Sequence, residues 1–218
     1  MIIVRLSRDE LGAVLVEVAL TMTIMLVFVL GSIEFLFVFY QWNVAAKAVQ
    51  IGTRIAATSD PVASGLRSLS VSVLGLLTQP GDPMPNYVVT CDGASASCTC
   101  SGSQACAAAG AYDAQAMNTI VFGRGSSSCS DATSPYNTGM CDIFPRITPS
   151  NVVIVYSRSG LGFAGRPGGP IPTITLSLQH LPFEFFILGG LMGFTKLQIP
   201  ALTTSITGED LSSTAPAF

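Results

Sequence analysis

Charged residues and histidine are scarce in this sequence. Only 11% of the 218 residues are Asp, Glu, Lys or Arg, and the single histidine is His180. The ten basic residues form no cluster, so the positive patch that nucleic-acid binding requires is missing and we expect no nucleic-acid partner. No motif surrounds His180 that would support a hydrolytic triad. The sequence therefore predicts a protein that is not an enzyme, with no cofactor and no metal.

The hydrophobic residues are concentrated in one block near the N-terminus. From Leu11 to Tyr40 the only charged residues are Glu17 and Glu34. About 20 apolar residues in a helix cross the ~30 Å hydrocarbon core of a bilayer. The block is too long for a cleaved secretory signal, and no A-x-A-like site follows it. We therefore expect one transmembrane helix that stays in the mature protein.

All six cysteines follow the apolar block within a short stretch. They are Cys91, Cys98, Cys100, Cys106, Cys129 and Cys141. An even, clustered set beyond a membrane anchor is typical of disulfides in an oxidising compartment. Zinc is the alternative, but no paired C-x2-C set is present. All six are disulfide candidates, and Cys129 with Cys141 is the favoured pair because they flank the same Ser-rich loop.

Beyond the membrane the helix is expected to continue as an amphipathic helix. Apolar and polar residues recur there on separate faces at spacings of three and four. The apolar positions are Val44, Ala48, Ile51 and Ile55, and the polar positions are Asn43, Lys47, Gln50 and Arg54. The apolar face is predicted to pack on the outer domain. Asp60 as N-cap and Pro61 at the first helical position then predict a second helix to about Thr78, with Leu66 and Leu69 facing inward.

The rest of the chain predicts an α+β fold: a long N-terminal transmembrane and amphipathic helix packed on a small antiparallel sheet, with disulfide-stapled loops. Strands are expected at residues 86–91, 152–156, 173–178 and 196–207, a helix at 112–122, and loops at 80–85 and 92–111. Residues 183–194 form an aromatic, apolar stretch, interpreted as core. The alternatives are a patch that docks a partner or one that lies on the bilayer.

A G-x-G-x-x-G pattern runs from Gly160 to Gly165. In a dinucleotide-binding loop this pattern opens a helix whose N-terminus holds the pyrophosphate. Here Arg166-Pro167-Gly168-Gly169-Pro170 follows, and these prolines and glycines prevent a helix. The pattern is therefore interpreted as a hairpin loop.

The start of the apolar block resembles a type IV pilin leader. Met1 to Gly12 is a short leader with Arg5 and Arg8, and Gly12-Ala13-Val14-Leu15-Val16-Glu17 follows. The resemblance implies cleavage by a prepilin peptidase between Gly12 and Ala13. An ionised carboxylate in hydrocarbon is costly unless it is paired, and the amino terminus of a neighbouring subunit would pair with Glu17. The alternative is an uncleaved signal anchor, with Glu17 at headgroup depth.

Three spaced segments resemble the TadE-like family. They are Gly12-Ala13-Val14-Leu15-Val16-Glu17-Val18-Ala19-Leu20, then Gly31-Ser32-Ile33-Glu34-Phe35, then Asn43 to Ala57 ending Gly52-Thr53-Arg54-Ile55-Ala56-Ala57. The chain departs from the family pattern at Leu11, Val18 and Val49-Gln50-Ile51. The resemblance implies a pseudopilin or minor pilin, without catalytic activity, that assists assembly of a tight-adherence (Tad, Flp-type) pilus.

Together these features predict a leader at residues 1–12, the TadE-like helix at 13–58 and an extracytoplasmic α+β domain at 59–218. We expect a single-pass protein of a bacterial inner membrane, with its C-terminal domain in the periplasm. Its expected partners are other pilins and pseudopilins, the pilus assembly machinery and the prepilin peptidase, with Glu17 and Glu34 as subunit-assembly residues. The alternative is a membrane-anchored periplasmic binding protein unrelated to pili.

Overall fold

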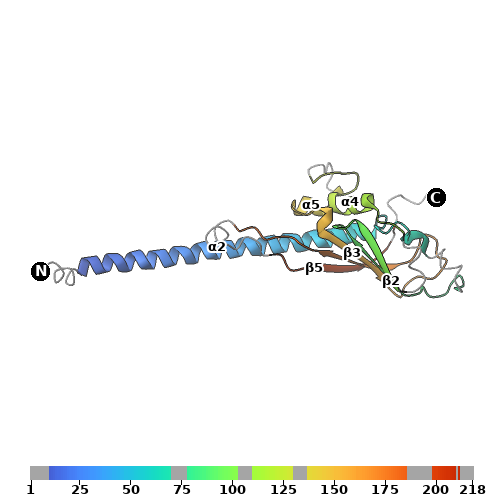
Figure 1. Ribbon diagram of the computed structural model, residues 1–218, viewed down its shortest axis with the longest axis horizontal. Coiled ribbons are helices and arrows are strands. Elements are labelled where there is room, and N and C mark those ends of the chain that lie inside the picture. The colour runs from blue at the N-terminus through green and yellow to red at the C-terminus, as the bar shows by residue number, and fades with distance from the viewer. Residues whose placement is uncertain are drawn as a thin grey trace. The chain divides into compact units, whose positions relative to one another are not determined.

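The structure is a computed structural model that describes residues 10–69, 78–102, 110–129, 137–185, 198–209 and 211 (Figure 1). The chain forms two compact units. Unit 1 comprises Met1–Gln41 and Phe183–Leu197, and unit 2 comprises Trp42–Pro182 and Gln198–Phe218. Helix α2 (Glu10–Ala57) contributes to both units, as expected for one long helix that continues past the apolar block.

Unit 2 is built on a five-stranded antiparallel sheet with the strand order β2-β1-β3-β4-β5. The strands are β1 (Tyr87–Asp92), β2 (Ser97–Gly102), β3 (Val152–Arg158), β4 (Pro172–Leu178) and β5 (Leu202–Thr207). The prediction of an α+β fold with an antiparallel sheet is therefore confirmed. The expected loop at residues 92–111 is wrong in part, because β2 lies within it. Its Ser-Cys-Thr-Cys-Ser-Gly sequence has little β-propensity, and pairing with β1 supplies the hydrogen bonds that hold it.

One face of the sheet carries the core of unit 2. Alternate residues of the three central strands are almost completely shielded from solvent, as period-2 alternation requires. These residues are Tyr87, Val89, Cys91, Val152, Ile154, Tyr156, Ile174, Leu176 and Leu178. Burying a side chain such as Ile154 or Leu176 contributes roughly 1.5–3 kcal/mol to folding. Tyr156 also accepts a hydrogen bond at its hydroxyl from the Val62 backbone N–H, at 3.0 Å, so both buried polar groups are satisfied.

Residues 42–57 of α2 bury a face made of small side chains. Its buried members are Ala45, Ala48, Val49, Gly52, Thr53, Ala56 and Ala57. The predicted polar face is confirmed, since Asn43, Lys47, Gln50 and Arg54 are all exposed. The predicted apolar face is displaced, because Val44, Ile51 and Ile55 lie half-buried at the edges of the small-residue face. Small side chains let the helix backbone approach its neighbours more closely than β-branched ones would.

Gly52 shows how tight this packing is. A Cβ atom at this position would lie 2.6 Å from Cγ of Met140 and 3.2 Å from Cδ1 of Leu176. Both neighbours are fully buried. The glycine therefore sits where the helix meets the core of unit 2, and a larger side chain has no room there.

The start expected for the second helix, at Asp60 and Pro61, is wrong, because residues 60–65 are not helical. The backbone around Val62 is bonded to distant segments: its carbonyl accepts from the Asp113 N–H at 2.7 Å, and Ser64 N–H donates to the Ala111 carbonyl at 3.0 Å. These long-range bonds use groups that a helix would need. A short 3-10 helix, η1 (Leu66–Ser68), follows, and residues 70–77 lie outside the described residues. Leu66 and Leu69 are buried as predicted.

Helix α4 (Ala114–Phe122) confirms the helix expected at residues 112–122. Its N-cap, Asp113, accepts hydrogen bonds at Oδ1 from the N–H groups of Gln115 and Ala116, at 2.8 and 3.1 Å. Ala116 and Ile120 face inward as predicted. The short helices α5 (Met140–Ile143) and η4 (Pro149–Asn151) lie between α4 and β3 in the chain.

The glycine pattern at residues 160–165 lies in the connection between β3 and β4. Gly160, Gly162 and Gly165 all have φ near +80°, a region that favours glycine. The strands on either side pair antiparallel with each other. The prediction of a hairpin loop is confirmed.

Candidate functional site

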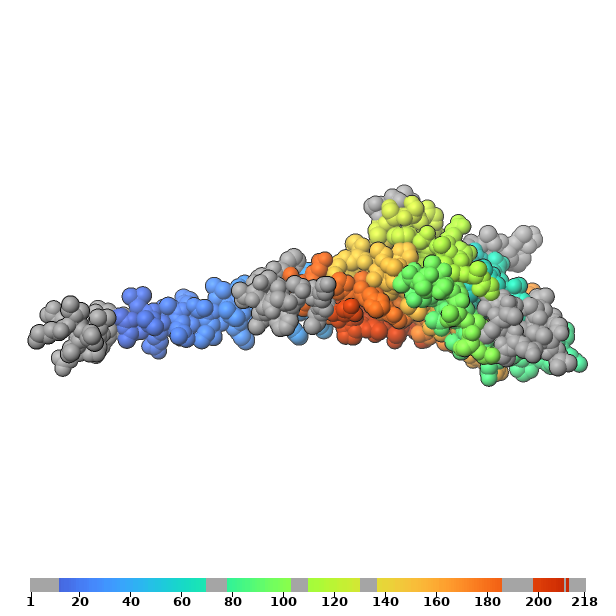
Figure 2. All heavy atoms as spheres, viewed as in Figure 1, coloured from blue at the N-terminus to red at the C-terminus, as the bar shows by residue number. Residues whose placement is uncertain are grey.

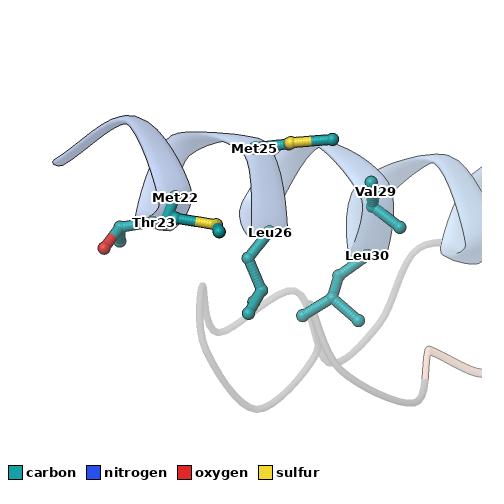
Figure 3. Close-up of a pocket in the computed structure, with 6 residues that line it drawn as sticks. All are labelled: Met22, Thr23, Met25, Leu26, Val29 and Leu30. Atoms are coloured by element: carbon teal, nitrogen blue, oxygen red, sulfur yellow. The ribbon is translucent and has the colours of Figure 1, made fainter. Parts of the chain in front are cut away.

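The part of α2 in unit 1 exposes apolar side chains around the helix. Residues 12–29 are all exposed, although an 18-residue window of α2 has a mean hydropathy of 2.6. Six residues of this stretch line a pocket, and Figure 3 labels them: Met22, Thr23, Met25, Leu26, Val29 and Leu30. The helix is long and apolar enough, by length and composition, to cross a membrane. Its uncovered apolar surface is what a single-pass membrane anchor presents to lipid.

The hydroxyl groups of this stretch are satisfied within the helix. Thr21 Oγ1 donates to the Glu17 carbonyl at 2.9 Å, Thr23 Oγ1 to Ala19 at 2.7 Å and Ser32 Oγ to Phe28 at 2.9 Å. These three are the Ser and Thr residues between Gly12 and Tyr40. An unsatisfied hydroxyl in hydrocarbon is costly, so this bonding suits a helix in lipid. Glu17 and Glu34 are the two charged side chains of this stretch, and a charged side chain is costly in hydrocarbon.

The predicted processing and assembly residues lie on the uncovered helix. Gly12 and Glu17 are exposed, and a Cβ built on Gly12 would meet no atom within 4 Å. Ala13 is likewise exposed and helical. Residues 1–9 of the expected leader lie outside the described residues. Glu17 therefore presents its carboxylate to whatever surrounds the helix.

Glu34 differs from Glu17 in its surroundings. It is only 2% exposed. Glu34 lies seventeen positions after Glu17, which corresponds to about 25 Å along the helix axis. The structure does not bring them together, so one neighbouring group cannot pair with both. The assembly role expected of Glu34 stays a prediction, and its burial makes Glu17 the better candidate for a contact between subunits.

A pair of hydrogen bonds at the end of the apolar stretch was not expected from the sequence. Gln41 donates from Nε2 to the Glu184 carbonyl at 2.9 Å and accepts at Oε1 from the Glu184 N–H at 3.1 Å. Gln41 is 3% exposed, and Phe183 packs edge-to-face on Phe185 with ring centroids 6.4 Å apart. The start of the aromatic stretch is thus hydrogen-bonded to the helix within unit 1. Residues 186–194 of that stretch lie outside the described residues.

Comparison with known proteins finds a match for the anchor segment. Residues 12–54 match the family model described as TadE-like protein. The anchor segment of this chain is TadE-like. No curated protein and no solved structure matches the chain significantly. The suspected family resemblance is confirmed over these 43 residues, which indicates a membrane-anchoring helix and a part in Tad pilus assembly.

The TadE-like segment covers both halves of α2. It begins at Gly12, contains the exposed Glu17 and the buried Glu34, and ends at Arg54, within the small-residue face. The signal for that face is present in the sequence, because Ala45, Ala48, Gly52 and Ala56 recur at helical spacing. Sequence reasoning missed it by ranking the larger side chains as the packing surface.

The cysteines form one disulfide between two described residues. Cys91 and Cys98 lie directly opposite each other on β1 and β2 and are bonded. Cys100 is also disulfide-bonded, and Cys106 lies outside the described residues. Cys129 and Cys141 are free thiols in the structure, not the expected disulfide. The two thiols share a side-chain hydrogen bond. Burial is the main cause that raises the pKa of the Cys141 thiol, and the neighbouring Cys129 raises it further. A neutral, hydrogen-bonded thiol is the form that this buried site favours.

Counting thiols in the purified full chain tests this assignment. We expect alkylation in denaturant without reductant to modify two cysteines, Cys129 and Cys141. Under native conditions Cys141 should be protected, because it is buried and the thiolate is the reactive form. Mass spectrometry of peptides reads both results. Fewer than two modified cysteines would show that the pair closes to a disulfide, whereas more than two would contradict the disulfides on β1 and β2.

Proposed function

We propose that this protein is a pseudopilin or minor pilin that assists assembly of a Tad pilus. The single observation that carries the proposal is the apolar helix of the TadE-like segment. It is uncovered on all sides over residues 12–29 and presents Gly12, Ala13 and Glu17 near its start. The proposal places the helix in a bacterial inner membrane, with unit 2 in the periplasm. The disulfides on β1 and β2 support an oxidising compartment.

In this proposal the leader is removed between Gly12 and Ala13 by a prepilin peptidase, which creates a new α-amino group at Ala13. The Glu17 carboxylate of one subunit then pairs with the Ala13 ammonium of a neighbouring subunit. Each charge alone would be costly in hydrocarbon, and pairing lowers that cost. The pairing of the Glu17 carboxylate with the Ala13 ammonium sets the axial displacement between neighbouring helices. Other pilins and pseudopilins are the partners that carry the same arrangement.

The mature N-terminus tests the proposal. We expect the protein isolated from cells with an active prepilin peptidase to begin at Ala13, as read by intact mass and N-terminal sequencing. Gly12→Val should block cleavage by disturbing recognition of the cleavage site by the peptidase. The space around Gly12 is open, so the larger side chain disturbs no packing in the protein itself. Gly31→Val is the matched control, since its surroundings are also open and it lies far from the cleavage point. A wild-type chain that retains Met1 in such cells would contradict the proposed processing.

A further inference from the structure

The face of the sheet opposite the core is almost free of charge. Strand alternation places fifteen residues there: eleven are Ser or Thr, three are Val and one is Asp. We call this the outer face. It consists of Val88, Thr90, Asp92, Ser97, Thr99, Ser101, Val153, Val155, Ser157, Thr173, Thr175, Ser177, Thr203, Ser205 and Thr207. All fifteen are half-buried or exposed, and Figure 2 shows these strands, in green, orange and red, at the surface of unit 2.

The outer face is a regular grid across the five strands. Its central row runs Thr99, Thr90, Val155, Thr175 and Ser205, each directly opposite the next. The strands have no break in alternation over these positions, so the side chains stand side by side at the usual spacing of ~4.8 Å. The six threonines and three valines place methyl groups in every row of this layer of small side chains. Such a layer fits another flat layer better than it fits a narrow ligand.

Many hydroxyl groups of the outer face are bonded within it. Thr175 Oγ1 and Ser205 Oγ lie 2.8 Å apart, and Ser157 and Ser177 donate to the carbonyls of Thr173 and Val153, each at 3.4 Å. Hydroxyls that already have partners lose less on removal from water. Covering this face would therefore cost less than covering a face of lysine and glutamate. The one carboxylate, Asp92, lies in an end row between Ser97 and Val153 and accepts the Ala94 N–H at 2.9 Å.

We propose that the outer face packs against the same face of a second copy of this chain. An uncharged face is compatible with itself, because stacking two copies opposes no like charges over the grid. Two sheets packed face to face lie ~10 Å apart, and their valine and threonine side chains interdigitate. A two-fold arrangement brings the centre of one face, Val155, onto the centre of the other. This proposal depends on membrane anchoring and goes beyond the proposed role in pilus assembly.

The outer face is small for an interface between two proteins. Five strands of about six residues cover ~24 Å by ~20 Å, so the pair buries about 1,000 Å² in total. That is near the lower limit for a specific interface, and such a contact is weak between molecules free in solution. Anchoring by α2 confines copies to one membrane surface and raises their effective concentration. The contact therefore forms between membrane-anchored copies.

The test uses the full chain in liposomes. Copies carrying donor or acceptor fluorophores on a C-terminal tag are mixed and energy transfer is measured. We expect Val155→Lys and Val155→Glu each to reduce specific transfer at least fivefold when present alone, since like charges then meet at the centre. Mixing the Val155→Lys and Val155→Glu copies should restore it, because opposite charges meet instead. Restoration identifies the occupant as the same face of a second copy.

Thr175→Lys is a second variant in the central row, in case Val155→Lys lowers stability, and thermal unfolding checks both. Asn118→Lys on the exposed side of α4 is the control and should leave transfer unchanged. Wild-type transfer no higher than for an unrelated anchored protein would overturn the proposal. The proposal would also be overturned if the Val155 and Thr175 variants fold and keep full energy transfer. Loss that the mixture does not restore would also overturn it, by showing that the occupant is not the same face.

Discussion

Replacing Glu17 by alanine is expected to reduce pili on the cell surface at least tenfold while the protein still inserts in the membrane. In the proposed arrangement, Glu17 is the partner of the Ala13 ammonium of the next subunit. A loss of about 1.4 kcal/mol per contact is already tenfold in an equilibrium, and an unpaired ammonium in hydrocarbon costs more than that. Insertion itself should become slightly more favourable, since a charge has been removed from the apolar helix. Electron microscopy counts the pili, and membrane fractionation follows the protein.

Two further substitutions separate charge from structure. Glu17→Gln keeps the size of the side chain and removes the charge, so it should behave like alanine. Glu17→Asp keeps the charge on a shorter side chain and should retain part of the piliation. Because the Glu17 side chain is exposed, none of these changes should alter thermal unfolding of unit 2. Normal piliation in Glu17→Gln would remove the proposed role of this carboxylate and leave the anchoring function intact.

Replacing Gly52 by leucine is expected to destabilise unit 2 by about 1–3 kcal/mol, because extra atoms in a packed interior force side chains and backbone to shift. The new Cβ alone would lie 2.6 Å from Cγ of Met140 and 3.2 Å from Cδ1 of Leu176, both fully buried. Leucine favours a helix over glycine by up to about 1 kcal/mol, which offsets only part of the cost. Thermal unfolding of the full chain in detergent, followed by circular dichroism of the sheet, measures the change.

Gly31→Leu is the matched control on the same helix. A Cβ at Gly31 would meet no atom within 4 Å, so only the gain in helix propensity remains. We expect the melting temperature of this variant to equal that of the wild type or to exceed it slightly. Equal destabilisation by both substitutions would show that the helix, and not the packing at Met140 and Leu176, responds to the change.

The elements that were read correctly from the sequence are those whose residues determine their own conformation. The apolar helix, α4 and the alternating strands β3 and β4 carry local patterns strong enough to identify them. The elements that were missed depend on partners far away in the chain. Strand β2 is held by β1, and the stretch after Asp60 by Tyr156, Asp113 and Ala111.

The sequence by itself determined that the chain carries an apolar helix of membrane-spanning length, with Gly12 and Glu17 at its start and the TadE-like pattern along it. Hydrophobicity, helical spacing and motif order are properties of the local sequence, so no tertiary contact was needed. Only the tertiary structure decided which side of residues 42–57 is buried, that Glu34 is buried while Glu17 is exposed, and that eleven hydroxyl side chains share one sheet face. Those outcomes depend on strand register and on close packing between segments distant in the chain, which local patterns do not encode.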